Sequence, residues 1–286
     1  MKGIEFEFGN VLGLYDKRIK QTITYENTTA EHIVLTQNDG DELYDEELWL
    51  FSRLDECERR YSVGFFMDEK GHLCPVNKPA FCFFPTKEVT NLNFILHAPF
   101  LLTDSREGIR AGVAHNDKLI RRLAELSADA LVHLRDIGIY TSTKLIDDNI
   151  VDIIPTDEAV FSDPADKRKV SFLPFFEEIK GKLKSCAIIP SVDGYVESEN
   201  AYWAAVPQLT QLFSNEQLSD ITENANAQWV FVTLGRDEVQ RNNKALFSYI
   251  EDLIKTNLNE DAIINGRSRD FYYNRILGIR QTLENV

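Results

Sequence analysis

The chain has 286 residues, with 31 basic and 46 acidic side chains and a formal net charge of −15. Hydrophobic residues make up 43% and charged residues 27% of the sequence, which is ordinary for a folded globular protein and argues against disorder. The acidic balance makes nucleic acid a poor default partner, and no apolar run approaches the ~18 residues that predict a membrane-spanning helix.

The N-terminus and the cysteines favour a cytoplasmic location. Glu5 and Glu7 interrupt the first apolar stretch, so no signal peptide is predicted. The cysteines are widely spaced and form no CxxC or Cys/His zinc pattern; they are Cys57, Cys74, Cys82 and Cys186. We therefore expect reduced, mostly buried thiols.

The first part of the chain predicts β-structure. Ile4, Phe6 and Phe8 alternate with polar residues, as in a strand with one buried face. The acidic stretch 39–47 is expected to be a solvated loop or face, and residues 68–71 (DEKG) predict a hairpin turn. Further strands are predicted at 19–25, 32–36, 61–67, 73–76, 80–84 and 94–96, and the last two are expected to be buried.

The clearest predicted element is a long helix. Its apolar residues step by four and three and form one stripe; they are Leu119, Leu123, Leu126, Ala130, Leu134 and Ile137. Asn116 or Asp117 is expected to cap its N-terminus, and Gly138 is expected to close its C-terminus.

The sequence pattern changes after about residue 152, where several prolines predict a stretch rich in loops. The length predicts about two domains, at ~150 residues each, and we expect them to be 1–145 and 146–286. In the second, smaller α/β unit, helices are predicted at 175–184 and 246–254. Strands are predicted at 187–189, 195–196 and 229–234, with a turn at 192–194.

The familiar catalytic motifs do not occur. The sequence contains no GxxxxGK[ST], GxGxxG, GxSxG or HExxH pattern. His97 and His115 are possible acid–base groups, but His97 is better interpreted as a core imidazole and His115 as a capping or surface residue. A self-contained enzyme is therefore the weakest of the interpretations.

An ordered set of short motifs lies between residues 80 and 138. It consists of 84–87 (FPTK), 97–100 (HAPF), 104–107 (DSRE) and then the long helix. This order resembles the middle segment of heat-shock-chaperone-like ATPases, members of the gyrase, heat-shock chaperone, histidine kinase and MutL (GHKL) superfamily. It is most similar to large bacterial ATP-binding proteins of this type and to sacsin-type repeats.

The resemblance implies an α/β (α+β) fold in which 1–145 is a ribosomal-S5-domain-2-like transducer sandwich, about four strands covered by helices. In that superfamily a separate, preceding domain holds ATP and Mg²⁺, and its signature segments do not occur in this sequence. We therefore expect a piece of a longer, chaperone-like protein that follows its nucleotide-binding domain. The chain alone is expected to bind no cofactor and to lack activity, whereas the parent protein is expected to be an ATPase.

The same resemblance assigns candidate site residues. Arg106 is expected to contact the terminal phosphate of ATP held by the upstream domain, because an arginine fork binds phosphate oxygens in pairs. Lys87 is the second candidate, with Thr86, Ser105 and Glu107 beside them. The competing interpretation of Arg106 is an ion pair with Asp104 or Glu107, or plain surface charge. Lys87 has the same surface alternative.

The expected partners are the upstream ATP-binding domain and a protein client, with no membrane. The alternative function is a stand-alone protein-interaction module with no catalytic activity. It is suggested by the aromatic-rich second half, since aromatic side chains are enriched at interface hot spots. Residues 271–273 (FYY) are the best candidates for exposed apolar surface in that interpretation.

Overall fold

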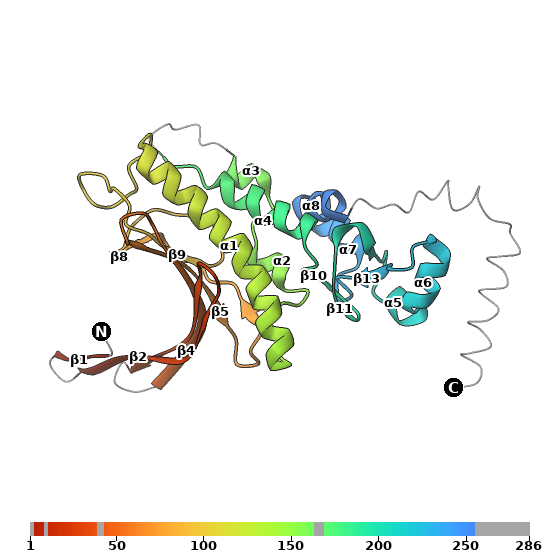
Figure 1. Ribbon diagram of the computed structural model, residues 1–286, viewed down its shortest axis with the longest axis horizontal. Helices are drawn as coiled ribbons and strands as arrows, with labels where there is room; N and C mark the ends of the chain where they lie inside the picture. The colour runs from red at the N-terminus through yellow and green to blue at the C-terminus, as the bar shows by residue number, and fades with distance from the viewer. Residues whose placement is uncertain (1–2, 9–10, 39–42, 163–168, 255–286) are drawn as a thin grey trace, which may run out of the picture. The chain divides into compact units, whose positions relative to one another are not determined.

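The computed structural model describes residues 3–8, 11–38, 43–162 and 169–254 (Figure 1). The fold combines antiparallel sheets with helices and is of the α+β class. The chain divides into two compact units, Met1–Lys182 and Leu183–Val286. In the described part of the chain, no helix is long and apolar enough to cross a membrane.

The first unit is built on a sheet that has nine strands in the described residues. Five consecutive antiparallel strands form a meander, and four short strands extend it in the order β1-β2-β3-β4-β5-β9-β7-β8, with β6 beside β5. The strands are β1 Gly3–Phe8, β2 Val11–Thr24, β3 Thr29–Asn38, β4 Leu43–Leu54, β5 Arg60–Met67, β6 Leu73–Cys74, β7 Phe81–Cys82, β8 Phe84–Pro85 and β9 Ile95–His97.

Helix α1 (Ala114–Thr141) packs against β4 and β5 (Figure 1). The predicted apolar stripe is confirmed, because every one of its six residues is buried. The predicted caps are wrong. The N-cap is Val113, without a side-chain hydrogen bond, and Ser142 ends the helix in a left-handed conformation. The Asn116 side chain instead forms hydrogen bonds with backbone groups of Leu101 and Arg110, and Gly138 lies inside the last turns of the helix.

Gly138 is needed because the chain folds back over the helix end. A Cβ atom at this position would lie 2.6 Å from the carbonyl oxygen of Thr143. The Thr143 amide donates to the Gly138 carbonyl at 2.9 Å, which fixes that close approach.

One strand prediction in the first unit needs correction. Residues 80–84 do not form one buried strand, because the chain reverses at Phe83, whose φ is +63°, and two short strands result. Phe83 and Phe84 are 75% and 79% exposed. The described part of the acidic stretch is a solvated face, one of the two expected alternatives, because residues 43–47 belong to β4 and residues 44–46 are exposed. Polar residues on β2 and β3 partner its carboxylates. For example, Thr36 donates to Asp45, and Lys20 pairs with Glu47.

The cysteines also differ from expectation. All four are free thiols, as predicted, but Cys57 is exposed and the other three are partly exposed. Cys57 lies in the turn between β4 and β5, and Cys74 and Cys82 lie on two-residue strands, so none of these thiols is covered on all sides. By contrast, the predicted hairpin at 68–71 is confirmed. Gly71 adopts φ +82°, and the Asp68 carboxylate accepts the amides of Lys70 and His72.

The first unit extends past residue 145 to Lys182 because later segments complete its core. Short helices α2 (Ile150–Ile153) and α3 (Glu158–Phe161) follow α1. In helix α4 (Leu173–Ser185), Phe175 packs on Phe94 with ring centroids 6.0 Å apart. Lys182 and Arg53 both pair with Asp129 of α1, at 2.6 and 2.7 Å.

The second unit holds a small mixed sheet in the order β11-β10-β13-β12, in which β12 and β13 are parallel. Its elements are β10 Ile189–Ser191, β11 Gly194–Val196, η1 Ser198–Asn200, β12 Ala201–Trp203, α5 Leu209–Leu212, α6 Asn215–Thr222, β13 Gln228–Val230, α7 Arg236–Asn242 and α8 Lys244–Ile254. The strand predicted at 229–234 ends early, because Phe231 adopts φ +48°. Residues 271–273 lie outside the described residues.

Two helical glycines give a matched test of the packing. We expect Gly138→Ala to lower the free energy of unfolding by about 1–3 kcal/mol, since the new Cβ would overlap a backbone oxygen. Gly181→Ala in α4 meets no atom within 4 Å and should raise it by about 0.5–1 kcal/mol through helix propensity. Urea unfolding of both variants measures the difference, and equal effects would contradict the close approach at Gly138.

His133 predicts a pH dependence of stability. Its ring stacks on Tyr25 with centroids 3.7 Å apart, and burial lowers its pKa below 6.5. As the pH falls through 6.5, the unfolded chain takes up a proton that the folded protein does not. The free energy of unfolding should therefore fall until the pH reaches the folded pKa. Urea unfolding at several pH values should show a shallower dependence for His133→Phe, and an unchanged dependence would refute this assignment.

Candidate functional site

The segment between β9 and α1 forms a closed loop, residues 101–110, that carries most of the predicted site residues. Leu102 and Ile109 form an antiparallel bridge at its base. The Thr103 amide donates to the Gly108 carbonyl at 2.8 Å, and the Arg106 amide donates to the Thr103 carbonyl at 2.8 Å. Arg106 stands at the tip in a left-handed conformation, with φ +59°.

Asn116 ties this loop to α1. Its side chain is fully buried. The Oδ1 atom accepts the Leu101 amide at 2.9 Å, and Nδ2 donates to the carbonyls of Leu101 and Arg110 at 2.8 Å each. One amide thus holds both ends of the loop, which explains why Asn116 is not the helix cap.

The other side of the loop is held by the segment after β8. The Glu88 carboxylate accepts the Ile109 amide at 2.9 Å, and the Lys87 amide donates to the Glu107 carbonyl at 2.6 Å. The Thr86 hydroxyl donates to the Ala80 carbonyl at 2.7 Å and is nearly buried. Thr86, one of the predicted site residues, therefore uses its hydroxyl to hold the backbone of this segment in place.

The charged neighbours of Arg106 form ion pairs with one another, whereas Arg106 does not. Lys87 pairs with Glu107, and Arg110 pairs with Asp104, each at 2.5 Å. Both carboxylates considered as partners of Arg106 thus bind other basic residues. Arg106 is exposed, and its guanidinium has no carboxylate partner among the described residues. Exposed ion pairs contribute little to the free energy of unfolding. Their consequence here is that Arg106 keeps a guanidinium without a carboxylate partner among the described residues.

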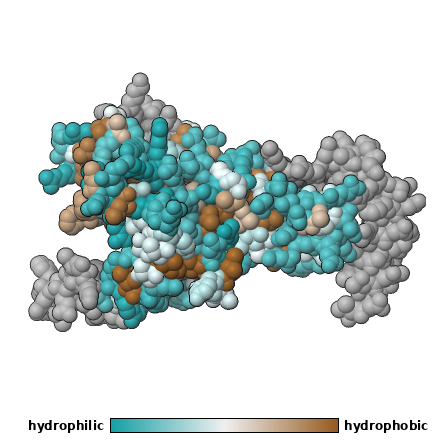
Figure 2. All heavy atoms as spheres, viewed as in Figure 1, coloured by the Kyte–Doolittle hydropathy of each residue, from teal (hydrophilic) through white to brown (hydrophobic). Residues whose placement is uncertain are grey.

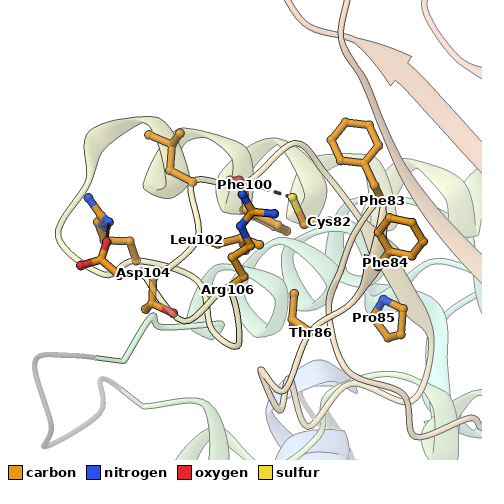
Figure 3. Close-up of a pocket in the computed structure, with 12 residues that line it drawn as sticks. Cys82, Phe83, Phe84, Pro85, Thr86, Phe100, Leu102, Asp104 and Arg106 are labelled. Carbon is orange, nitrogen blue, oxygen red and sulfur yellow. Dashed lines mark hydrogen bonds and ion pairs between the residues drawn. The ribbon is translucent and has the colours of Figure 1, made fainter.

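The loop and the β7–β8 turn line an open pocket of about 690 Å³ (Figure 3). Arg106 extends across it from the loop, and Phe83, Phe84 and Pro85 stand on the other side. The lining consists of Cys82, Phe83, Phe84, Pro85, Thr86, Phe100, Leu101, Leu102, Thr103, Asp104, Arg106 and Arg110. Figure 2 shows hydrophobic residues gathered among hydrophilic ones at this end of the first unit.

Burial holds two titratable groups near the pocket, Cys82 and His97, toward their neutral forms. Burial raises the pKa of the Cys82 thiol, which donates to the Phe100 carbonyl at 3.4 Å. Burial and the nearby Arg60 lower the pKa of His97, whose ring meets the edge of Phe83 with centroids 5.6 Å apart. His115 lies 3.2 Å from the Pro99 carbonyl. His97 thus contacts the ring of Phe83, and His115 contacts a loop carbonyl. Neither histidine forms a hydrogen bond with a serine or cysteine in the described residues.

Neither a metal-ligand cluster nor a known relative assigns a function to the site. Within the described residues, no three His, Cys, Asp or Glu side chains come together as metal ligands. No family model, curated protein or solved structure matches the chain.

Three of the five predicted site residues, Ser105, Arg106 and Glu107, lie on the 101–110 loop, whereas the sequence did not indicate the pocket wall opposite it. Lys87, Arg106 and Glu107 are close together, and Ser105 lies beside them with its hydroxyl 3.2 Å from that of Thr103. Phe83 and Phe84 were expected inside a strand. The proline at position 85 was the available signal that this strand stops, but nothing local indicated a left-handed phenylalanine.

The Asn116 amide gives a test of how the loop is held. Asn116→Ala leaves three backbone groups without their partner, and we expect the free energy of unfolding to fall by about 1–3 kcal/mol. Trypsin should also cleave after Arg106 and Arg110 faster than in the unmodified protein. The exposed neighbour variant Asp117→Ala is the control: it should leave cleavage unchanged and lower the free energy of unfolding only by about 0.3–1 kcal/mol, because it removes an acidic side chain from the first turn of α1. Unchanged cleavage in Asn116→Ala would disprove the clamp.

Proposed function

We propose that this chain is the middle, transducer region of a heat-shock-chaperone-like ATP-binding protein of the GHKL superfamily. In this proposal a separate, preceding domain of the same polypeptide holds ATP and Mg²⁺. The chain couples the nucleotide state of that domain to conformational change and acts on a protein client in the cytoplasm. Residues 1–145 are its ribosomal-S5-domain-2-like transducer sandwich, a proposal supported by a helix packed across an antiparallel sheet. The sheet departs from the resemblance in size, because it has nine strands in the described residues where about four are expected.

The single observation that carries this proposal is the state of Arg106. It is exposed at the tip of a braced loop, and its guanidinium is not engaged by any described carboxylate. An arginine that has to reach a phosphate on another domain needs both properties, since an internal ion pair would have to break first. Lys87 is the second candidate, but its ammonium already binds Glu107.

The chemistry assigned to Arg106 is charge stabilisation. A guanidinium donates paired hydrogen bonds to phosphate oxygens and stays charged at every physiological pH. In other phosphoryl-transfer enzymes an arginine placed in this way is worth ~10³–10⁵ in rate. ATP in the preceding domain would supply the reacting phosphate, and Mg²⁺ would neutralise part of the charge on its oxygens. This chain's residues hold the cation in place, with Ser105 and Glu107 next to it and Thr86 bracing the opposite segment.

Arg106→Ala in the full-length parent protein tests the role. ATP turnover should fall at least ~10²-fold, because the developing charge loses its cation, while ATP affinity stays nearly unchanged. Lys87→Ala should reduce turnover less. Arg121→Ala, which removes an exposed arginine of α1, should leave turnover unchanged. A full rate in Arg106→Ala would remove this residue from the mechanism.

A second candidate is a stand-alone protein-interaction module with no catalytic activity. The exposure of Phe83 and Phe84 favours it, since large apolar side chains in water are typical of binding surfaces. This candidate gains if turnover of the parent is independent of Arg106 and Lys87 alike.

A further inference from the structure

We infer that the pocket beside Arg106 is a binding site for a small organic anion, a compound with a flat apolar body and one negatively charged group. The pocket, the phenylalanine wall and the unmatched cation carry this inference, and none of them depends on a nucleotide. The site goes beyond the proposed function, which uses only the guanidinium of Arg106.

The apolar part of the ligand is specified by the wall opposite the loop. Phe83 and Phe84 expose most of their surface to water, and Pro85, Phe100 and Leu101 continue the apolar lining. Aromatic faces bury large apolar areas and favour flat ring systems that stack or meet edge to face. A ligand that covers these rings removes from water a surface that the folded protein leaves uncovered.

The charged part is specified by Arg106. Of the two arginines that line the pocket, Arg110 is paired with Asp104, so Arg106 supplies the available positive charge. Its fork fits a carboxylate, sulfonate or phosphate group. The chain carries a net charge of −15, which repels anions in general. A plain inorganic anion gains only the one cation, whereas an amphiphilic anion gains the apolar wall as well.

The pocket is preorganised for such a ligand. Two non-glycine residues that line it, Phe83 and Arg106, adopt left-handed conformations with φ +63° and +59°. Such strained positions persist only where the surroundings enforce them, and they cluster at binding sites. Here Asn116 and Glu88 hold the loop that carries Arg106. The volume of about 690 Å³ also lies in the range of small-molecule pockets.

Occupation of this pocket has a consequence for Arg106. A guanidinium bound to the ligand is withdrawn from any phosphate on another domain, so the ligand would inhibit the parent enzyme. This consequence rests on the proposed function, whereas the binding itself does not.

The test uses two fluorescent probes that share one ring system. 8-Anilinonaphthalene-1-sulfonate carries the anion, and N-phenyl-1-naphthylamine lacks it. Titration of this chain should give saturable binding of the sulfonate. Arg106→Gln should weaken it about tenfold, the value of one charge-assisted hydrogen bond. It should leave the neutral probe unaffected. Phe83→Asn, which tolerates the left-handed conformation, should weaken both probes about tenfold.

Arg121→Gln, an exposed arginine of α1, is the matched control and should bind both probes like the unmodified chain. Circular dichroism and the urea midpoint verify that each variant is folded. Absence of saturable sulfonate binding, or equal affinity in Arg106→Gln and the control, would overturn the inference. These titrations contain no ATP, so their failure leaves the proposed role of Arg106 in turnover standing, and failure of the turnover test leaves the pocket standing.

Discussion

The buried amide of Asn116 connects the two features on which the site depends. Its helix, α1, is fixed on the sheet by a continuous apolar stripe. Its three hydrogen bonds attach both ends of the 101–110 loop to that helix. A buried amide that lost these partners would carry a large desolvation cost, so loop, helix and sheet hold their positions together. The core of the first unit therefore fixes the position of Arg106 through α1 and Asn116.

Charge pairing then decides what the loop presents. The loop contains two acidic and two basic residues, and the ion pairs of Glu107 with Lys87 and of Asp104 with Arg110 engage the other candidate cations. Arg106 is left without a carboxylate partner among the described residues. Its position next to two uncovered phenylalanines gives the same place both an electrostatic and an apolar preference. Phosphate recognition uses only the first preference, and an amphiphilic anion uses both.

The polar groups around the pocket favour binding over chemistry. Cys82 and His97 are held toward their neutral forms by burial, and their hydrogen-bond or ring contacts are to structural atoms and to Phe83. A nucleophile with an adjacent base would need the opposite arrangement. The described part of this site therefore supplies a positioned cation and an apolar surface, which are the means of recognition and of electrostatic assistance.

The sequence by itself determined the long helix, several of the strands and the hairpin at residues 68–71, because periodicity and turn residues act over short distances. Only the tertiary structure decided that Asn116 clamps the loop, that Phe83 leaves the sheet, and that Glu107 and Asp104 choose Lys87 and Arg110 over Arg106. These outcomes depend on partners that are distant in sequence or on a backbone conformation that several residues enforce together. Local patterns carry no record of either.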